Sequence, residues 1–376
     1  MGVRCREVAA VVVDRSHIGV LFDALIASGY TIIGPTHRDD AIVYDEVASP
    51  ADLPAGWTDH QDGGTYRLER RTDEALFGYA VGPQSPKRYL FPPRTALFDI
   101  ERSNGSLTFT QRQAATTKYA FIGLRACELA AIAIQDRVFI ESGVVDRTYA
   151  GVRERMLVVA VNCAVAGGTC FCESMGTGPR CSDGYDLVMT ELIDSDGHRF
   201  VFEAGSDEGR RLLDTMPNHP ATPGDIELVD ATVAATSAAM GRSLDTDGIK
   251  ELLESNREHP RWDTVAQRCL ACTNCTLVCP TCFCSTTEDV ATLDGGGATR
   301  SRRWDSCFTM DFSTLHGRSV RTTTSARYRQ WMTHKLASWY DQFGSSGCVG
   351  CGRCITWCPV GIDITKEAAL IRLETS

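Results

Sequence analysis

Residues 1–245 are predicted to form an α/β domain, and residues 246–376 a second, helical and cysteine-rich domain. Two observations lead to this division. Short apolar runs that suit buried strands recur through the first half, whereas eleven of the 17 cysteines fall between Cys269 and Cys358. With 376 residues, the chain is long enough for two or three domains.

The first half contains short apolar runs that are typical of buried strands. They are Val8–Val13, Thr31–Gly34, Tyr119–Leu124 and Met156–Asn162. The segment Cys127–Ile140 is rich in Ala, Ile and Leu and is expected to be a buried helix that follows the third strand. This order of strands and helix predicts an α/β fold.

The remainder of the first domain is expected to end in a hairpin and a helix. Leu187–Ile193 and His198–Phe202 flank the turn sequence Asp194–Gly197, which predicts two paired strands. A polar stretch punctuated by prolines, Pro217–Pro223, is expected to be a connection. The alanine-rich run Ala231–Met240 predicts a helix at the edge of the domain.

From about residue 245 the pattern becomes helical. A first helix is expected around Ile249–Leu253. A second is indicated by apolar residues at steps of four and three, which place one stripe on a helix: Tyr328, Met332, Leu336, Trp339 and Phe343. Gly344 follows at the position of a C-cap.

Composition excludes several classes of function. A formal charge of −10 and a pI near 5.3 argue against nucleic acid as a partner, because phosphate binding needs a basic surface. No apolar run approaches the roughly 18 residues that span a bilayer. The run Val8–Val13 is short and closed by Asp14, which does not fit a signal peptide. The expected compartment is therefore the reducing cytoplasm, where clustered thiols usually serve metal binding or catalysis.

Two cysteine motifs share one unusual spacing. Each has three cysteines two residues apart, then a fourth after three more residues, followed by proline. They run from Cys269 to Pro280 and from Cys348 to Pro359. This is the spacing of bacterial-type [4Fe-4S] ligation, in which the fourth cysteine of each motif ligates the other cluster.

The predicted ligand sets follow from that exchange. The first cluster takes Cys269, Cys272, Cys275 and Cys358, and the second takes Cys348, Cys351, Cys354 and Cys279. Structural zinc is the alternative, but zinc sites with paired cysteines do not use this spacing twice with a trailing proline. The second domain is therefore expected to be an α-helical, ferredoxin-like domain with two [4Fe-4S] clusters.

Four more cysteines stand near strand ends in the first half: Cys127, Cys163, Cys170 and Cys172. Strand ends and one loop can bring such thiols to one edge of a sheet, the usual place for a site in an α/β fold. From spacing alone two interpretations stay open, a third iron–sulfur cluster or reduced thiols that pack as small hydrophobes. The glycine-rich segment Ser174–Pro179 is expected to be a tight loop over a cluster.

The roles of the remaining cysteines are open. Cys282, Cys284 and Cys307 lie between the two motifs, where they could ligate, line a cluster pocket or pack as buried thiols. Cys181 is a spare candidate ligand for the third site.

A family resemblance is strongest in four stretches of the second half: Cys269–Cys284, Arg303–Cys307, Ala326–Lys335 and Gly347–Pro359. It extends into the first half through Asp39–Asp45, Tyr89–Pro93, Arg125–Cys127 and Thr169–Pro179. These stretches resemble the beta (iron–sulfur) subunit of cytosolic NiFe hydrogenases of the sulfhydrogenase type, a family that includes the iron–sulfur A subunit of anaerobic sulfite reductase. The first half is distantly similar to the beta subunit of the F420-reducing hydrogenase, with matches at Cys127 and around Cys163. That likeness favours the third cluster, but without a clear flavin signature FAD is not expected.

The resemblance implies an electron-transfer subunit without catalytic residues of its own. Its [4Fe-4S] clusters would relay electrons between a NiFe hydrogenase core and a flavin subunit that reacts with NAD(P)H. The implied partners are the large and small hydrogenase subunits and the flavin subunit. The alternative is the corresponding A subunit of a siroheme sulfite reductase.

Overall fold

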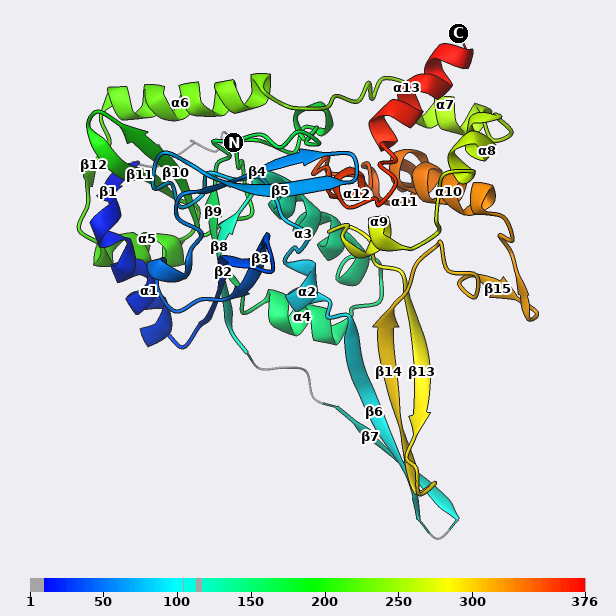
Figure 1. Ribbon diagram of the computed structural model, residues 1–376. Coiled ribbons are helices and arrows are strands. Elements are labelled where there is room, and N and C mark those ends of the chain that lie inside the picture. The colour runs from blue at the N-terminus through cyan, green and yellow to red at the C-terminus, as the bar shows by residue number, and fades with distance from the viewer. Residues whose placement is uncertain (1–9, 104, 113–116, 376) are drawn as a thin grey trace, which may run out of the picture.

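The computed structural model describes residues 10–103, 105–112 and 117–375, and its largest element is an eight-stranded sheet (Figure 1). In spatial order the strands are β12 (His219–Pro220), β1 (Val11–Asp14), β11 (Gly197–Ala204), β10 (Leu187–Asp194), β9 (Leu157–Val161), β8 (Tyr119–Leu124), β2 (Thr31–Arg38) and β3 (Ala41–Glu46). The four central strands β10, β9, β8 and β2 are parallel, and the outer ones pair antiparallel. Their carboxyl ends therefore meet at one edge, where Cys127 and Cys163 follow β8 and β9.

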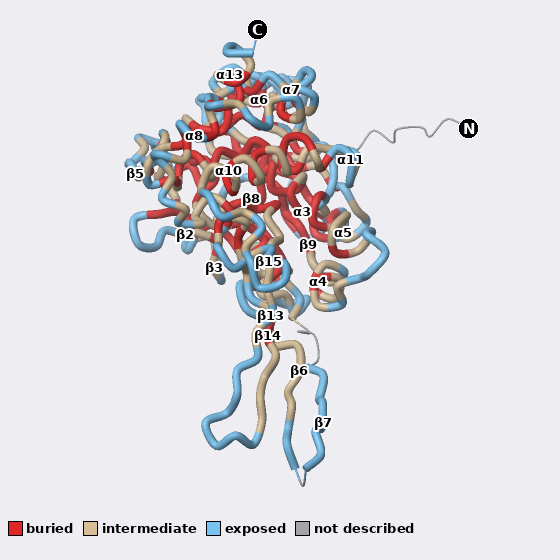
Figure 2. The backbone as a smooth tube through the Cα atoms, turned by 90° about the vertical axis from the view of Figure 1, so that its right-hand side faces the viewer, coloured by how far each residue is buried: buried red, intermediate tan, exposed pale blue. Residues whose placement is uncertain are grey.

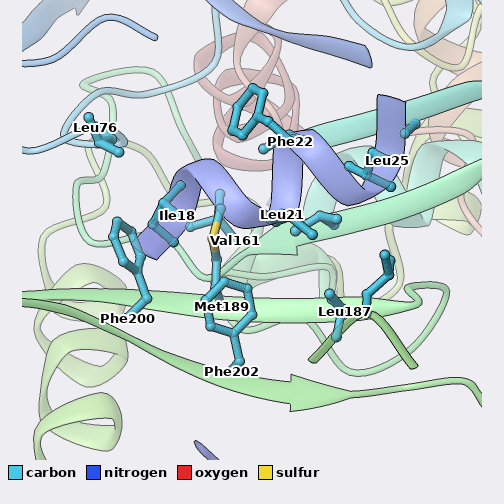
Figure 3. Packing of buried hydrophobic residues seen from close by; sticks show 14 of the residues in the cluster. Ile18, Leu21, Phe22, Leu25, Leu76, Val161, Leu187, Met189, Phe200 and Phe202 are labelled. Carbon is cyan, nitrogen blue, oxygen red and sulfur yellow. The ribbon is translucent and has the colours of Figure 1, made fainter. Parts of the chain in front are cut away.

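Helices cover both faces of this sheet. One face carries α1 (Ile18–Ala27) and α5 (Asp207–Thr215), and the other carries α3 (Ala126–Phe139), α4 (Arg147–Arg153) and α6 (Pro223–Ala238). Successive strand residues alternate between the faces, as the pleat requires. Figure 3 shows the α1 side, where Ile18 and Leu21 face the sheet residues Met189, Phe200 and Phe202. Covering both faces explains why these strands read as continuous apolar runs.

Most predicted elements of this half are confirmed. The strand at Tyr119–Leu124 and the hairpin of β10 and β11 form as expected, and α3 begins one residue before the predicted helix. The run Val8–Val13 is described only from residue 10, and its strand begins at Val11.

One boundary is wrong. Helix α6 begins at Pro223, inside the stretch predicted to be a connection. The Thr222 hydroxyl accepts a hydrogen bond from the Asp225 amide, and the Asp225 carboxylate accepts one from the Thr222 amide. This capping box starts a helix in which proline at the first position loses no hydrogen bond.

The second half contains eight helical segments among its described residues: α7 (Ile249–Ser255), α8 (Arg261–Ala266), α9 (Asn274–Leu277), α10 (Thr324–Thr333), the π-helical turn η4 (His334–Ser338), α11 (Trp339–Phe343), α12 (Arg353–Thr356) and α13 (Ile364–Thr375). They pack around a core that includes Trp262, Tyr328 and Trp331. The predicted stripe is confirmed as a buried face from Tyr328 to Trp339. Gly344, at φ 71°, ends α11 in the left-handed conformation.

Two hairpins distant in sequence join into a projecting four-stranded sheet. Its strands, in the order β13 (Ser285–Ala291), β14 (Gly297–Trp304), β6 (Arg94–Ser103) and β7 (Ser106–Gln111), extend away from the body as an arm of half-buried and exposed residues (Figures 1 and 2). The expectation that residues 246–376 are α-helical is therefore incomplete. Strands β13 and β14 are polar and lack the apolar runs on which strand prediction depends.

Smaller elements complete the fold. They are β4 (Trp57–Asp62), β5 (Thr65–Arg70), α2 (Lys87–Leu90), β15 (Thr314–Leu315), β16 (Arg318–Ser319) and the 3₁₀ turns η1 (Arg15–His17), η2 (Pro50–Asp52) and η3 (Glu173–Met175). The turn of the β4–β5 hairpin lies against the second cysteine motif, where the Gly64 amide donates to the Ile355 carbonyl at 3.1 Å. None of the helices in the described ranges combines the length and apolar character needed to cross a bilayer.

Candidate metal centres

The first predicted thiol set lines one pocket. Cys269, Cys272, Cys275 and Cys358 surround about 440 Å³ of space that opens partly to solvent. Its other walls are mainly apolar and include Tyr328. The Ala271 amide donates to Cys269 Sγ at 3.4 Å, and the Ile362 amide donates to Cys358 Sγ at 3.3 Å. Such N–H···S bonds are among the contacts that tune iron–sulfur clusters.

Tight backbone turns produce the close approach of these loops. Ala271 and Thr273 adopt φ values of 50° and 69°, which residues other than glycine rarely do. The short helix α9 then carries Cys275 back toward the pocket. Cys272 is exposed, so the first set lies at the surface of the molecule.

The second predicted set lies deeper. Cys279 interacts electrostatically with each of Cys348, Cys351 and Cys354, although 69 residues separate it from the first of them. The Gly350 amide donates to Cys348 Sγ at 3.5 Å. Cys354 also lines the pocket of the first set, which makes the two sets neighbours.

The second motif packs directly on the α/β half. Gly350 and Gly352 have φ values of 63° and 73°, and the Phe171 amide donates to the Gly350 carbonyl at 2.8 Å. A Cβ atom built at Gly352 would lie 2.4 Å from the Thr169 carbonyl oxygen. Glycine is therefore required here, because two backbones approach too closely for a side chain.

The four cysteines of the first half also gather. Cys172 interacts electrostatically with Cys163 and Cys170, and it is a neighbour of Cys127. A Cβ at Gly178 would lie 3.1 Å from Cys172 Sγ, so the glycine-rich loop does pass over this set. Cys351 of the second set is an electrostatic neighbour of Cys172, Cys170 and Cys127.

The spare cysteine, Cys181, lies beside this group. It interacts electrostatically with Cys163, and its Sγ is 3.7 Å from the Val161 carbonyl oxygen, to which it donates. It packs with apolar residues of the sheet face that carries α3.

Charged side chains beside these thiols were not predicted from the sequence. Arg353 and Glu128 are both 0% exposed along their side chains, and Arg353 Nη2 donates to Glu128 Oε1 at 2.5 Å. Arg125 donates to the carbonyls of Phe77 and Tyr79 and to the thiol of Cys163. The sequence did offer one sign of these charged residues: Glu128 directly follows Cys127, and Arg353 directly precedes Cys354.

Beside these thiols, two buried guanidinium nitrogens, Arg125 Nη1 and Arg353 Nη1, have no hydrogen-bond partner among the described residues. Buried polar groups normally have partners. Each of these arginines interacts electrostatically with thiols, Arg125 with Cys163 and Arg353 with Cys127 and Cys351. The surroundings therefore fit a bound group of negative charge.

Burial controls the protonation of most of these thiols. It raises the pKa of Cys348 and of Cys170 to about 12, and it raises the pKa of Cys127 and Cys354 as well. Such thiols stay protonated at neutral pH unless a metal binds and displaces the protons. Buried soft thiols around a cavity match the ligand chemistry of iron–sulfur centres.

The cysteines between the motifs form two close pairs. Cys282 is hydrogen-bonded to Cys279, and Cys284 to Cys307. The pKa of Cys279 is lowered by the bond from Cys282 and by the nearby Lys335, and that of Cys284 falls to about 7 through its bond with Cys307. Within residues 10–103, 105–112 and 117–375, no three Cys, His, Asp or Glu side chains close around a point that would hold a single ion.

Comparison with known proteins agrees with this geometry. A family model described as a 4Fe-4S dicluster domain matches residues 268–362, the segment that contains both motifs. Sulfhydrogenase 2 subunit beta of Pyrococcus furiosus is 29% identical over 319 residues, which cover 82% of this chain and 89% of that protein. No solved structure matches the chain significantly.

The predicted resemblance to the iron–sulfur beta subunit of sulfhydrogenases is thereby confirmed. The distant likeness to the F420-reducing hydrogenase stays a prediction, as do the assignments of individual ligands and the division at residue 245.

Proposed function

We propose that this chain, which resembles the beta subunits of sulfhydrogenases, is the electron-transfer subunit of a soluble NiFe hydrogenase complex. Bound [4Fe-4S] clusters would supply one-electron transfer between a hydrogenase core and a flavin subunit that reacts with NAD(P)H. The protein itself contributes thiolate ligands, hydrogen bonds to sulfur and a buried environment. No residue has to act as acid, base or nucleophile.

The observation that carries this proposal is the continuity of the three thiol sets. Cys272 is exposed at the first set, Cys354 borders both the first and second sets, and Cys351 neighbours the third. A relay needs redox centres in close succession from one surface to the interior. The proposed ligands are Cys269, Cys272, Cys275 and Cys358; Cys348, Cys351, Cys354 and Cys279; and Cys127, Cys163, Cys170 and Cys172.

A second opening supports exchange with more than one partner. A groove of about 820 Å³ reaches Cys348 and Cys181 between small residues of α3 and of the glycine-rich loop. Arg137 and Arg180 also line it. The series of thiol sets is thus accessible both at the first pocket and at this groove.

Iron and sulfide analysis of the anaerobically purified full chain tests the ligand assignment. Three clusters correspond to about 12 irons per chain. We expect Cys351→Ser and Cys172→Ser each to lose one set, about four irons. Cys5→Ser, which changes a cysteine outside every proposed set, is the matched control. Unchanged iron in Cys351→Ser would contradict the second site, and unchanged iron in Cys172→Ser would remove the third.

The identity of the complex needs a separate measurement. Nickel and flavin in the natively purified assembly would support the hydrogenase proposal. The alternative predicted from the sequence, a subunit of a sulfite reductase, requires siroheme in place of nickel.

A further inference from the structure

Lys335 is a buried lysine at the second thiol set. Lys335 lies on the π-helical turn η4, and only 5% of its surface is exposed. The ammonium donates to Cys279 Sγ at 3.1 Å, to Thr281 Oγ1 at 3.0 Å and to the Gly347 carbonyl at 3.3 Å. An ammonium has three donors, so its hydrogen-bonding capacity is used entirely at this site.

The backbone of the same residue holds the second motif. The Lys335 carbonyl accepts from the Gly347 amide at 2.8 Å and from Ser346 Oγ at 3.1 Å. A π-helical turn interrupts the regular hydrogen-bond ladder and is often found at functional sites. One residue thus ties the loop before Cys348 to Cys279, and so joins the two segments that complete the second set.

The charge of Lys335 has no carboxylate partner among the described residues, where its hydrogen bonds go only to sulfur, hydroxyl and carbonyl groups. A buried cation without a counter-charge is strongly destabilising. Its electrostatic neighbours are Cys279, Cys282 and Cys348. The compensating negative charge must therefore come from sulfur, in the form that ligates metal.

We propose that Lys335 is a positioning residue that joins the two ligand segments of the second set and raises the reduction potential of the cluster held there. This inference rests on the proposed function. Reduction adds one negative charge to a cluster, and hydrogen bonds to its sulfurs and its net charge set its potential. A fixed positive charge in contact with Cys279 therefore favours the reduced state.

A second buried lysine provides the matched control. Lys87 is 4% exposed and is also an electrostatic neighbour of Cys279 and Cys282. Its ammonium donates to the Leu277 carbonyl at 3.1 Å and lies 3.9 Å from the ring centre of Trp304. It carries the same charge into the same region without a hydrogen bond to a predicted ligand.

The test is a redox titration of the anaerobically purified full chain, followed by electron paramagnetic resonance. Lys335→Gln removes the charge and keeps a donor, whereas Lys335→Arg keeps the charge. With iron content unchanged, we expect Lys335→Gln to lower the reduced-to-oxidised ratio of one cluster at least tenfold at fixed potential, about 59 mV for one electron. Lys335→Arg should stay closer to the wild type, and Lys87→Gln should shift the ratio less.

Two results would overturn the inference: wild-type potentials in Lys335→Gln, or equal shifts in Lys335→Gln and Lys87→Gln. Loss of about four irons from Lys335→Gln, with Lys335→Arg fully loaded, would support the joining role. Wild-type protein without iron and sulfide would instead contradict the proposed function.

Discussion

The buried ion pair between Glu128 and Arg353 offers a direct test of how the two halves are held together. Glu128 lies on α3 beside Cys127, and Arg353 lies within the second cysteine motif. The Glu128 carboxylate also accepts from Tyr44 Oη at 2.6 Å and from the Arg125 amide at 3.0 Å. Both charged groups are removed from water, with side chains 0% exposed.

The expected cost of breaking this pair is large. Removing one partner leaves the other charge buried and unpaired, which costs about 3–5 kcal/mol. Glu128→Gln and Arg353→Met should each lower the free energy of unfolding by that amount. The double variant should cost less than the sum of the single variants by more than about 2 kcal/mol, because the second change removes the charge left by the first.

Urea unfolding under anaerobic conditions, with iron content matched, measures these free energies. Tyr44→Phe is the matched control, since it removes one hydrogen bond to the same carboxylate and should cost about 1.5–3 kcal/mol. Additivity of the two single variants within about 0.5 kcal/mol would refute the reasoning. So would a cost for Glu128→Gln no larger than that of Tyr44→Phe.

Two further changes test local features. Gly352→Ala should lose the iron of the second set, because the new Cβ would lie 2.4 Å from the Thr169 carbonyl oxygen. Gly317 is the control, since it has a similar φ of 75° and a Cβ there would meet no atom within 4 Å. Gly317→Ala should keep all of its iron and lower the free energy of unfolding by only about 1–2 kcal/mol. Asp225→Asn should lower stability by about 1 kcal/mol at pH 7. The hydrogen bond from the Thr222 side chain holds the pKa of Asp225 below its ordinary value of 3.8, so this contribution is present above pH 3.8 and disappears as the pH falls through the lowered pKa. Urea unfolding at pH 7 and below pH 3.8 measures the difference, and a cost that persists unchanged at the lower pH would contradict the capping role.

Local patterns predicted the fold where the chain's own spacing determines it. The apolar runs at Tyr119–Leu124 and Leu187–Ile193 form strands because helices bury both of their faces. The stripe that begins at Tyr328 forms one buried helical face because its apolar residues recur at the helical period and pack into the core of the second half. The polar strands of β13 and β14 were missed because pairing with β6, rather than apolar burial, holds them in place.

In the candidate site too, local spacing predicts some residues and misses others. Three cysteines within seven residues must lie close together, so the spacing alone brings Cys269, Cys272 and Cys275 to one pocket. Glu128 and Arg353 each stand beside a candidate ligand in the sequence, but nothing local shows that they pair, because they are 225 positions apart. Lys335 lies on the same side of the helix as Tyr328 and Met332, so its burial follows from the helical period. Its hydrogen bond to Cys279, 56 residues earlier in the chain, has no local sequence signal.

The pairing of β6 with β14 has a consequence for how the protein is made. Arg94 and Arg303 are partners in this sheet although about 200 residues separate them. At ribosomal rates of 5–20 residues per second, the earlier hairpin waits roughly 10–40 s for its neighbour to emerge. During that interval the Thr169–Cys172 loop also lacks the cover that Gly350 later provides. Synthesis from the N-terminus therefore leaves the Thr169–Cys172 loop uncovered until the segment that contains Gly350 has been made.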